Sequence, residues 1–234
     1  MREPSTSPDA ARGRLRLPPA GRDVAARQPG RSEIRVGGRF AGLCYVPQTG
    51  VRRLVIMLHG AGGTAGAGLR LLLPHADERQ LMLYAPQAAG VSWDLIRGGY
   101  GPDVRRIQAA LDQLHGAPAQ PPAIGGFSDG ASYALSLGLI NGDLFGAVLA
   151  FSPGFAAPTQ QAGHPSFFVS HGRGDTVLPI DRCGRRVVRS LQAAGCPVHY
   201  HEFDGGHEVP PSVIDAALTW LAAVRADRAG RADR

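Results

Sequence analysis

The chain has 234 residues, 44% of them hydrophobic, so it can bury one substantial core and a single domain is expected. Its net charge of +6 comes from its ends, because residues 1–32 carry seven Arg against three acids and residues 225–234 carry four Arg against two Asp. We therefore expect no nucleic-acid binding, and no apolar run approaches the roughly 18 residues of a membrane span.

The two ends are expected to be disordered tails. Residues 1–32 are rich in Pro, Gly, Ala and Arg without a hydrophobic period, and residues 227–234 form a second tail, which leaves residues 33–226 as the folded domain. No apolar segment of a secretory signal follows the first arginines.

The cysteines are widely spaced and lack a C-x-x-C pair: Cys44, Cys183 and Cys196. We expect a reduced, cytoplasmic protein. The sequence does not indicate its oligomeric state.

Strand patterns begin directly after the first tail. Residues 33–47 alternate in polarity around Gly37-Gly38, which predicts a hairpin. Residues 52–60 (RRLVIMLHG) are a continuous apolar run that ends in glycine, which is typical of a strand buried on both faces. Five further runs have strand character: LMLYAP, AIGGF, GAVLAFSP, PSFFVSHG and PVHYHEF.

Segments of helical period separate these strands. They cover residues 66–79, 102–115, 128–141, 179–194 and 210–226. Pro102 and Pro211 suit the first turn of a helix, where the missing N–H leaves no hydrogen bond unmade. Strands that alternate with helices predict an α/β fold, with a mostly parallel sheet covered by helices on both faces and an antiparallel hairpin at its start.

Ser128 lies in Gly126-Phe127-Ser128-Asp129-Gly130, a G-x-S-x-G pattern between a predicted strand and a predicted helix. Such a serine is a candidate nucleophile, because glycines two residues away on either side let the chain fold back tightly. The helix that follows supplies backbone N–H groups for a developing oxyanion. The pentapeptide alone also fits a second interpretation, in which Ser128 only caps the helix.

A serine nucleophile needs a histidine to take its proton and a carboxylate to orient that histidine. Asp175 follows the strand PSFFVSHG, and His207 follows the strand PVHYHEF. The order Ser128, Asp175, His207 is the one expected for this topology, with all three at carboxyl ends of strands. Glu202 and Asp204 compete with Asp175 for the acid role, but the loop after the preceding strand favours Asp175.

The oxyanion donors are predicted from the loop HGAGG, residues 59–63, and from the start of the serine helix. We expect the backbone N–H groups of Ala61 and Asp129 to fill this role. The same glycines permit a dinucleotide-binding interpretation. That interpretation fails at the next strand, because LMLYAP ends without an acidic residue for a ribose.

At this point the sequence resembles the phospholipase/carboxylesterase group of α/β-hydrolases, which includes acyl-protein thioesterases. The matching pieces are LHGAGG, GFSDGASYALSLG, AFSPG, SHGRGDTVLP and FDGGHEVP. The resemblance implies Ser128 as nucleophile, Asp175 as acid and His207 as base. Asp129 departs from the amide or small residue that is common after the nucleophile in that group.

Other polar and aromatic residues have simpler interpretations. His59 and His171 precede glycines at strand ends, where a hydrogen-bonded structural imidazole is expected. No histidine pair has the spacing of a metal site, so we predict neither metal nor cofactor. Trp93 lies in a Gly-rich loop at the predicted catalytic edge and is either a core residue or a wall of the substrate pocket.

We therefore predict an α/β-hydrolase that acts on carboxylic esters or thioesters. Only ten residues, 155–164, separate AFSPG from PSFFVSHG, which leaves no room for a lid domain and favours short to medium acyl chains. Two alternatives remain. In the first alternative, the chain is a depolymerase or a thioesterase for a larger acyl carrier. In the second, it is a binding protein on a hydrolase scaffold.

Overall fold

A computed structural model describes residues 8–17, 28–114 and 118–224. The strands are β1 (Gly30–Val36), β2 (Arg39–Val46), β3 (Arg53–Leu58), β4 (Leu81–Pro86), β5 (Ala123–Phe127), β6 (Ala147–Phe151), β7 (Ser166–Gly172) and β8 (Val198–Phe203). The α-helices are α1 (Pro8–Ala11), α2 (Ala65–Arg70), α3 (Pro102–Leu111), α4 (Asp129–Ile140), α5 (Gly184–Ala193) and α6 (Pro211–Ala223). Two short 3₁₀ helices are η2 (Leu73–His75) and η3 (Asp94–Arg97).

The strands form one sheet in the order β1-β2-β4-β3-β5-β6-β7-β8. β1 pairs antiparallel with β2, and β2 with β4, whereas every pair from β4 to β8 is parallel. The hairpin predicted around Gly37-Gly38 is confirmed. Both glycines have positive φ, 56° and 77°, as a two-residue turn between right-twisted strands requires.

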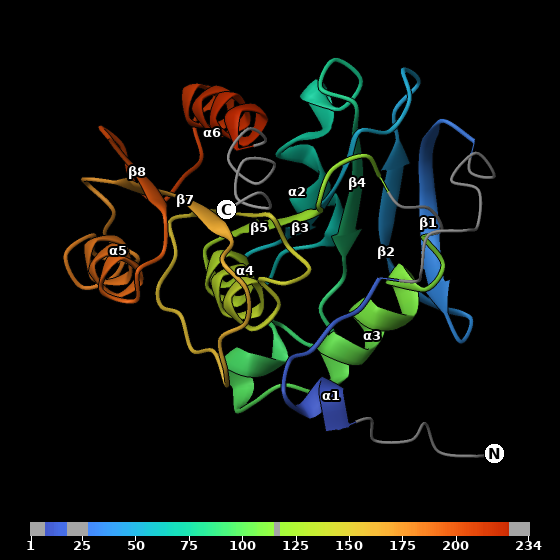
Figure 1. The fold of residues 1–234 in the computed structure, drawn as a ribbon, viewed down its shortest axis with the longest axis horizontal. Helices are drawn as coiled ribbons and strands as arrows, with labels where there is room; N and C mark the ends of the chain where they lie inside the picture. Colours follow the sequence, from blue (N-terminus) through green and yellow to red (C-terminus); the bar gives the residue numbers. More distant parts are fainter. Residues whose placement is uncertain (1–7, 18–27, 115–117, 225–234) are drawn as a thin grey trace, which may run out of the picture.

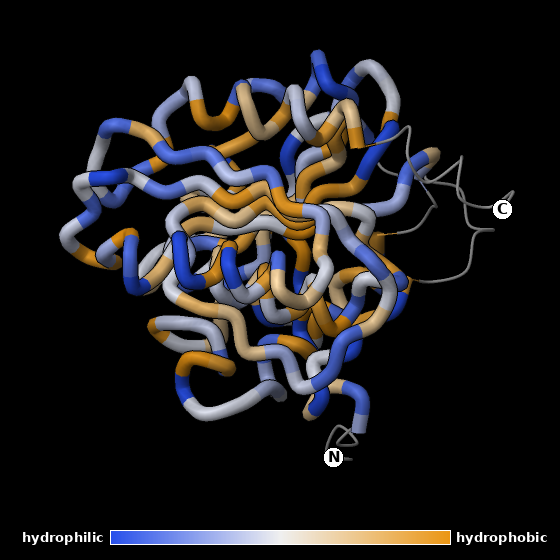
Figure 2. The backbone as a smooth tube through the Cα atoms, turned by 60° about the vertical axis from the view of Figure 1, so that its left-hand side comes forward, coloured by the Kyte–Doolittle hydropathy of each residue, from blue (hydrophilic) through white to orange (hydrophobic). Residues whose placement is uncertain are grey.

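Helices cover both faces of the sheet (Figure 1). One hydrophobic cluster joins the sheet to α1, α3, α4 and α5, and a second joins it to α2 and α6. All six residues of β3 are buried, which confirms the interpretation of that run as a central strand. Figure 2 shows the result as a hydrophobic layer of strands between more hydrophilic outer segments.

Two predicted helices differ from the structure at their ends. The run 66–79 divides into α2 and η2, because Pro74 lacks the N–H that an α-helix would use to bond the carbonyl of Arg70. The run 179–194 becomes helical only at Gly184, after a turn in which the N–H groups of Arg182 and Cys183 both donate to the carbonyl of Pro179.

The N-terminal residues differ from the expectation of a disordered tail over residues 1–32. Residues 8–17 lie against α3 and α4, with the Leu15 side chain only 1% exposed in the core, and β1 begins at Gly30. The remaining residues of that stretch, 1–7 and 18–27, lie outside the described residues, as does the predicted tail 227–234.

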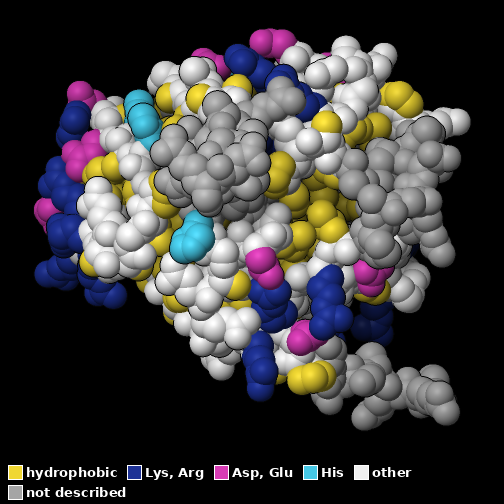
Figure 3. All heavy atoms as spheres, in the orientation of Figure 1, with side chains coloured by type: hydrophobic (Ala, Val, Ile, Leu, Met, Phe, Trp, Pro, Cys, Tyr) yellow, Lys and Arg dark blue, Asp and Glu magenta, His cyan; other side chains and the backbone are white. Residues whose placement is uncertain are grey.

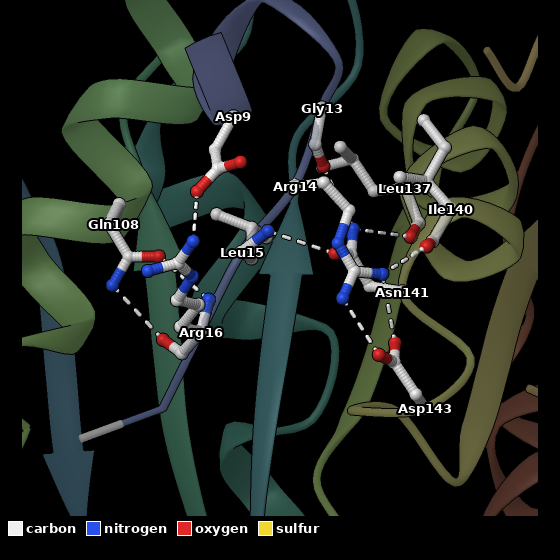
Figure 4. A network of polar contacts seen from close by, with 10 residues as sticks. All are labelled: Asp9, Gly13, Arg14, Leu15, Arg16, Gln108, Leu137, Ile140, Asn141 and Asp143. Carbon is white, nitrogen blue, oxygen red and sulfur yellow. Dashed lines mark hydrogen bonds and ion pairs between the residues drawn. The ribbon is translucent and has the colours of Figure 1, made fainter. Parts of the chain in front are cut away.

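Hydrogen bonds attach this segment to the end of α4 (Figure 4). The Leu15 amide donates to Asn141 Oδ1 at 2.8 Å, and Asn141 Nδ2 donates to the Gly13 carbonyl at 2.8 Å. The Arg14 guanidinium binds both carboxylate oxygens of Asp143. A stretch with one buried leucine has no hydrophobic period, so its sequence gave no sign of this docking. Among the described residues, no helix is long and apolar enough to cross a membrane.

Candidate active site

Ser128 lies on the sharp turn between β5 and α4, with φ 57° and ψ −121°. A Cβ on Gly126 would lie 2.5 Å from the backbone of Gly130, and one on Gly130 would lie 2.5 Å from the carbonyl oxygen of His59. Both glycines are therefore needed for the turn to pass this close to neighbouring backbone. The Ser128 side chain makes no capping hydrogen bond, so the helix-cap interpretation is wrong.

The Ser128 hydroxyl instead faces His207. Ser128 Oγ lies 2.9 Å from His207 Nε2, and His207 Nδ1 lies 2.7 Å from Asp175 Oδ2. A carboxylate accepts a proton, so Nδ1 carries the hydrogen and Nε2 is left as the acceptor of the serine O–H. The structure thus brings together the three residues predicted as nucleophile, base and acid, from the carboxyl ends of β5, β7 and β8.

The Asp175 side chain is fully buried and surrounded by donors. Its Oδ1 accepts the N–H groups of Val177 at 2.9 Å and Leu178 at 2.8 Å. Burial by itself acts to raise the pKa of Asp175. The hydrogen bonds from the Leu178 amide and from His207 outweigh that effect, so its pKa lies below the ordinary value.

His171, read from the sequence as a structural imidazole, lies beside this acid. Its Nε2 is 2.7 Å from the Leu178 carbonyl oxygen and 3.2 Å from Asp175 Oδ2, so Nε2 carries the hydrogen. Burial lowers the pKa of His171, which keeps the ring neutral. A Cβ on Gly184 would lie 2.6 Å from the ring, which explains why α5 starts with glycine at this point. The sequence did not reveal this contact with Asp175.

The competing carboxylates are bound elsewhere. Glu202 accepts hydrogen bonds from Arg185 at 2.7 and 2.8 Å, and Asp204 accepts one from Arg173 at 2.7 Å. The hydrogen bond from Arg185 lowers the pKa of Glu202 to about 2. Figure 3 shows arginine and acidic side chains interleaved at the left of the view, where α5 and β8 lie. Neither carboxylate contacts His207.

The loop after β3 passes directly over the serine. A Cβ on Gly60 would lie 3.4 Å from Ser128 Cβ, so this loop and the turn are in contact. The backbone N–H groups of Ala61 and Asp129 make no hydrogen bond within the described residues. Two unused donors on either side of a serine are what an oxyanion requires.

Trp93 does not line an open pocket. Its side chain is fully buried, stacks on Tyr133 with ring centroids 5.2 Å apart, and lies 4.8 Å from the His59 ring. Its Nε1 donates to the His59 carbonyl at 2.9 Å. The core interpretation of Trp93 is therefore correct, because the loop folds inward beneath the residues that contact the serine.

His59 is structural. Its Nδ1 lies 2.7 Å from the Gly60 carbonyl oxygen and its Nε2 accepts the Ala88 N–H at 3.2 Å, so both ring nitrogens are occupied. In the described part of the chain, no group of three or more His, Cys, Asp or Glu side chains is placed to hold a metal ion.

A mostly parallel sheet with a serine on the turn between β5 and the helix that follows it defines the α/β-hydrolase fold. The model of the phospholipase/carboxylesterase family matches residues 105–225, just over half of the chain. The chain belongs to this family, whose general chemistry is the hydrolysis of esters and thioesters.

Solved structures have the same fold at low sequence identity. Esterase PE8 is 23% identical with a TM-score of 0.67, covering 79% of this chain and 98% of that one. A phospholipase/carboxylesterase from Dyadobacter fermentans DSM 18053 is 23% identical with a TM-score of 0.60, covering 83% and 97%. Acyl-protein thioesterase 2 from Zea mays is 21% identical with a TM-score of 0.58, covering 78% and 99%. No curated protein sequence matches the chain significantly.

Proposed function

We propose that the chain is a serine hydrolase that cleaves carboxylic esters or thioesters of short to medium acyl chains through an acyl-serine intermediate. The observation that carries the proposal is the continuous hydrogen-bonded series from Ser128 Oγ through His207 to Asp175, at 2.9 and 2.7 Å. Each of the three groups has the neighbour that its role requires.

In the first step, Ser128 Oγ attacks the acyl carbonyl while His207 Nε2 takes the hydroxyl proton. The carbonyl oxygen becomes negative and accepts the N–H groups of Ala61 and Asp129. The bond from the carbonyl carbon to the leaving oxygen or sulfur then breaks, and the imidazolium returns its proton to that atom. Asp175 holds the ring in the required tautomer and stabilises its positive charge.

In the second step, water replaces the alcohol or thiol. His207 takes a proton from the water, whose oxygen attacks the acyl carbon. The bond from that carbon to Ser128 Oγ then breaks, the imidazolium returns its proton to Oγ, and the acid leaves as product. Every proton and leaving group is accounted for by the three side chains and water, so no cofactor is involved in these steps.

Exposed apolar side chains near the catalytic residues support an acyl substrate. Two large hydrophobic side chains are exposed in the described part of the chain, Val91 at 76% and Val177 at 64%. The Val91 carbonyl accepts a hydrogen bond from the N–H of Gly62, next to Ala61. The Val177 N–H donates a hydrogen bond to Asp175 Oδ1. An acyl chain attached to Ser128 therefore has apolar surface near both the oxyanion loop and the acid.

The proposal is tested by labelling with a fluorophosphonate and by Ser128→Ala. We expect one labelled serine in the wild type and none in the variant, with kcat lowered on the order of 10⁴- to 10⁶-fold on a p-nitrophenyl ester. Circular dichroism checks that the variant is folded. Hydrolysis within tenfold of wild type would assign the chemistry to another residue, and an unlabelled wild type would favour the binding-protein alternative.

A substrate panel then separates the esterase from its enzymatic alternative. We expect p-nitrophenyl esters from acetate to octanoate to be hydrolysed faster than palmitate, with one acyl thioester tested beside them. Activity confined to acylated protein or polymer would favour the depolymerase or carrier thioesterase.

Widely spaced cysteines without a C-x-x-C pair support a reducing, cytoplasmic location.

A further inference from the structure

Two adjacent residues connect the two sides of the proposed oxyanion hole. The Val91 carbonyl accepts the N–H of Gly62 at 2.7 Å, one residue after the donor Ala61. The Ser92 hydroxyl donates to Asp129 Oδ2 at 2.6 Å, and Asp129 supplies the other donor. One dipeptide is therefore bonded to both segments that carry the donors.

The next residue strengthens the connection. Trp93 Nε1 donates to the carbonyl of His59, at the start of the oxyanion loop, and its ring stacks on Tyr133 of α4. Tyr133 follows Asp129 by one helical turn, so the tryptophan also contacts both segments. We call residues 91–93 the clasp.

Two buried aspartates, Asp94 and Asp103, hydrogen-bond the chain on both sides of the clasp. Asp94 accepts the N–H groups of Gly101 and Asp103 and the hydroxyl of Tyr133, each at 2.8 Å. Asp103 in turn accepts the N–H groups of Ala89 at 2.6 Å and Asp94 at 2.8 Å. These hydrogen bonds hold Ala89 before the clasp and Asp94 after it, so the position of the clasp is fixed at both of its ends.

Ser92 is 7% exposed, and its hydroxyl is directed to Asp129. A hydroxyl that donates to a carboxylate at 2.6 Å forms a strong, charge-assisted hydrogen bond. The contact gives a partner to the acid after the nucleophile, where the resembled group has an amide or a small residue. Here the Asp129 carboxylate is the acceptor for the Ser92 hydroxyl.

We propose that the clasp positions the oxyanion hole: the Ser92–Asp129 and Val91–Gly62 bonds fix the separation of the Ala61 and Asp129 N–H groups. The inference rests on the proposed function, because it assigns a role within the same site. Preorganised donors stabilise the charge that develops in the transition state and do little for the bound substrate. Ser92 is therefore a positioning residue, whose loss lowers kcat and leaves KM nearly unchanged.

The test compares Ser92→Ala, Asp129→Ala and the double variant on one short-chain p-nitrophenyl ester. Removing a whole oxyanion donor lowers kcat by about 10²- to 10³-fold. In these variants both donors remain but are held less firmly, so kcat should fall by about 10- to 100-fold, with KM within about twofold of wild type. The double variant should lose no more than the worse single variant, because both break the same bond. Asp129→Asn keeps an acceptor and should lose less than Asp129→Ala.

Two further measurements separate positioning from general damage. The inhibition constant of a trifluoromethyl ketone, which forms a tetrahedral adduct with Ser128, should rise in parallel with the fall in kcat. The rate of fluorophosphonate labelling should fall as well, which gives a readout that does not depend on finding the right ester. Ser136→Ala, which removes another buried serine hydroxyl two turns along α4, is the matched control and should keep kcat within about twofold.

Unchanged kcat and labelling rate in both Ser92→Ala and Asp129→Ala would overturn the proposal. So would a rise in KM at constant kcat, which would make Ser92 a substrate contact, or fully additive losses in the double variant. These outcomes differ from failure of the proposed function, in which the wild type itself neither hydrolyses esters nor reacts with the fluorophosphonate.

Discussion

Asp175 shows how single residues of this site depend on their neighbours. One of its carboxylate oxygens accepts two backbone N–H groups, from Val177 and Leu178, and the other faces two imidazoles, those of His207 and His171. A carboxylate with four donors is held in one orientation and is stabilised in its ionised form. His207 is thereby fixed in the tautomer that accepts the serine proton.

Replacing Asp175 by Asn should lower kcat by about 10⁴-fold, because the wrong tautomer of His207 is then populated. Glu202→Gln and Asp204→Asn should stay within about tenfold, since their carboxylates bind Arg185 and Arg173 and do not contact His207. The three variants are assayed on one ester at pH 8. If Asp204→Asn instead showed the large fall in kcat, the acid would come from the loop that carries His207.

At the scale of elements, ion pairs attach the edge strand β8 to α5. The Arg185–Glu202 contact joins the two, with Glu202 only 20% exposed. The pKa of Glu202 is lowered from 4.5 to about 2, chiefly by hydrogen bonds from Arg185. A depressed pKa means that this contact stabilises the fold above about pH 4.5 and stops doing so as the pH falls towards 2.

Glu202→Gln should therefore reduce the free energy of unfolding at pH 7, and the difference from wild type should shrink between about pH 4.5 and 2. Urea unfolding at a series of pH values measures it. High salt should also reduce the difference at pH 7, because partly exposed ion pairs are screened. A difference that stays constant with pH would show that Glu202 stabilises β8 by packing instead of charge.

The docked N-terminal segment contributes to stability through Leu15. Because this side chain is 1% exposed, Leu15→Ala should lower the free energy of unfolding by about 2 to 4 kcal/mol. Arg16→Ala removes an ion pair with Asp9 whose arginine is 75% exposed, and should cost less than about 0.5 kcal/mol. Denaturant unfolding compares the two. Equal, small effects would mean that residues 8–17 do not belong to the folded core in solution.

At the scale of the whole molecule, the described residues place no lid domain between β6 and β7. Among the described residues, β6 and β7 are joined without an intervening helix, and an isolated bridge from Gly163 to Gly142 is the only regular pairing there. We therefore expect that substrate enters the site without a large movement of the chain.

We expect no interfacial activation as a result. Rates on a short-chain ester should follow a simple saturation curve through its solubility limit, because no lid has to be displaced by a lipid surface. Soluble and emulsified esters, measured at matched total concentration, provide the comparison. A sharp rise in rate at the onset of emulsion would indicate a closed state of the site.

Much of this protein follows from its sequence. Hydrophobic runs of period 2 and 3.6 predict the α/β order, because burial of one face or two leaves a local trace in the chain. The G-x-S-x-G pattern and the loops after β7 and β8 likewise predict Ser128, Asp175 and His207, since parallel strands bring their carboxyl ends to one edge. The choice of Asp175 over Glu202 and Asp204 also follows from this order of strands.

Only the tertiary structure decided the contacts between segments distant along the chain. Leu15 has no periodic partners nearby, and its place depends on Asn141, 126 residues away. Trp93 is equally compatible with a core or a pocket until its loop is folded. The Ser92–Asp129 hydrogen bond joins a loop to the start of α4, between residues 37 positions apart. Single long-range hydrogen bonds leave no pattern in local sequence, because their geometry exists only once the sheet has brought the loops together.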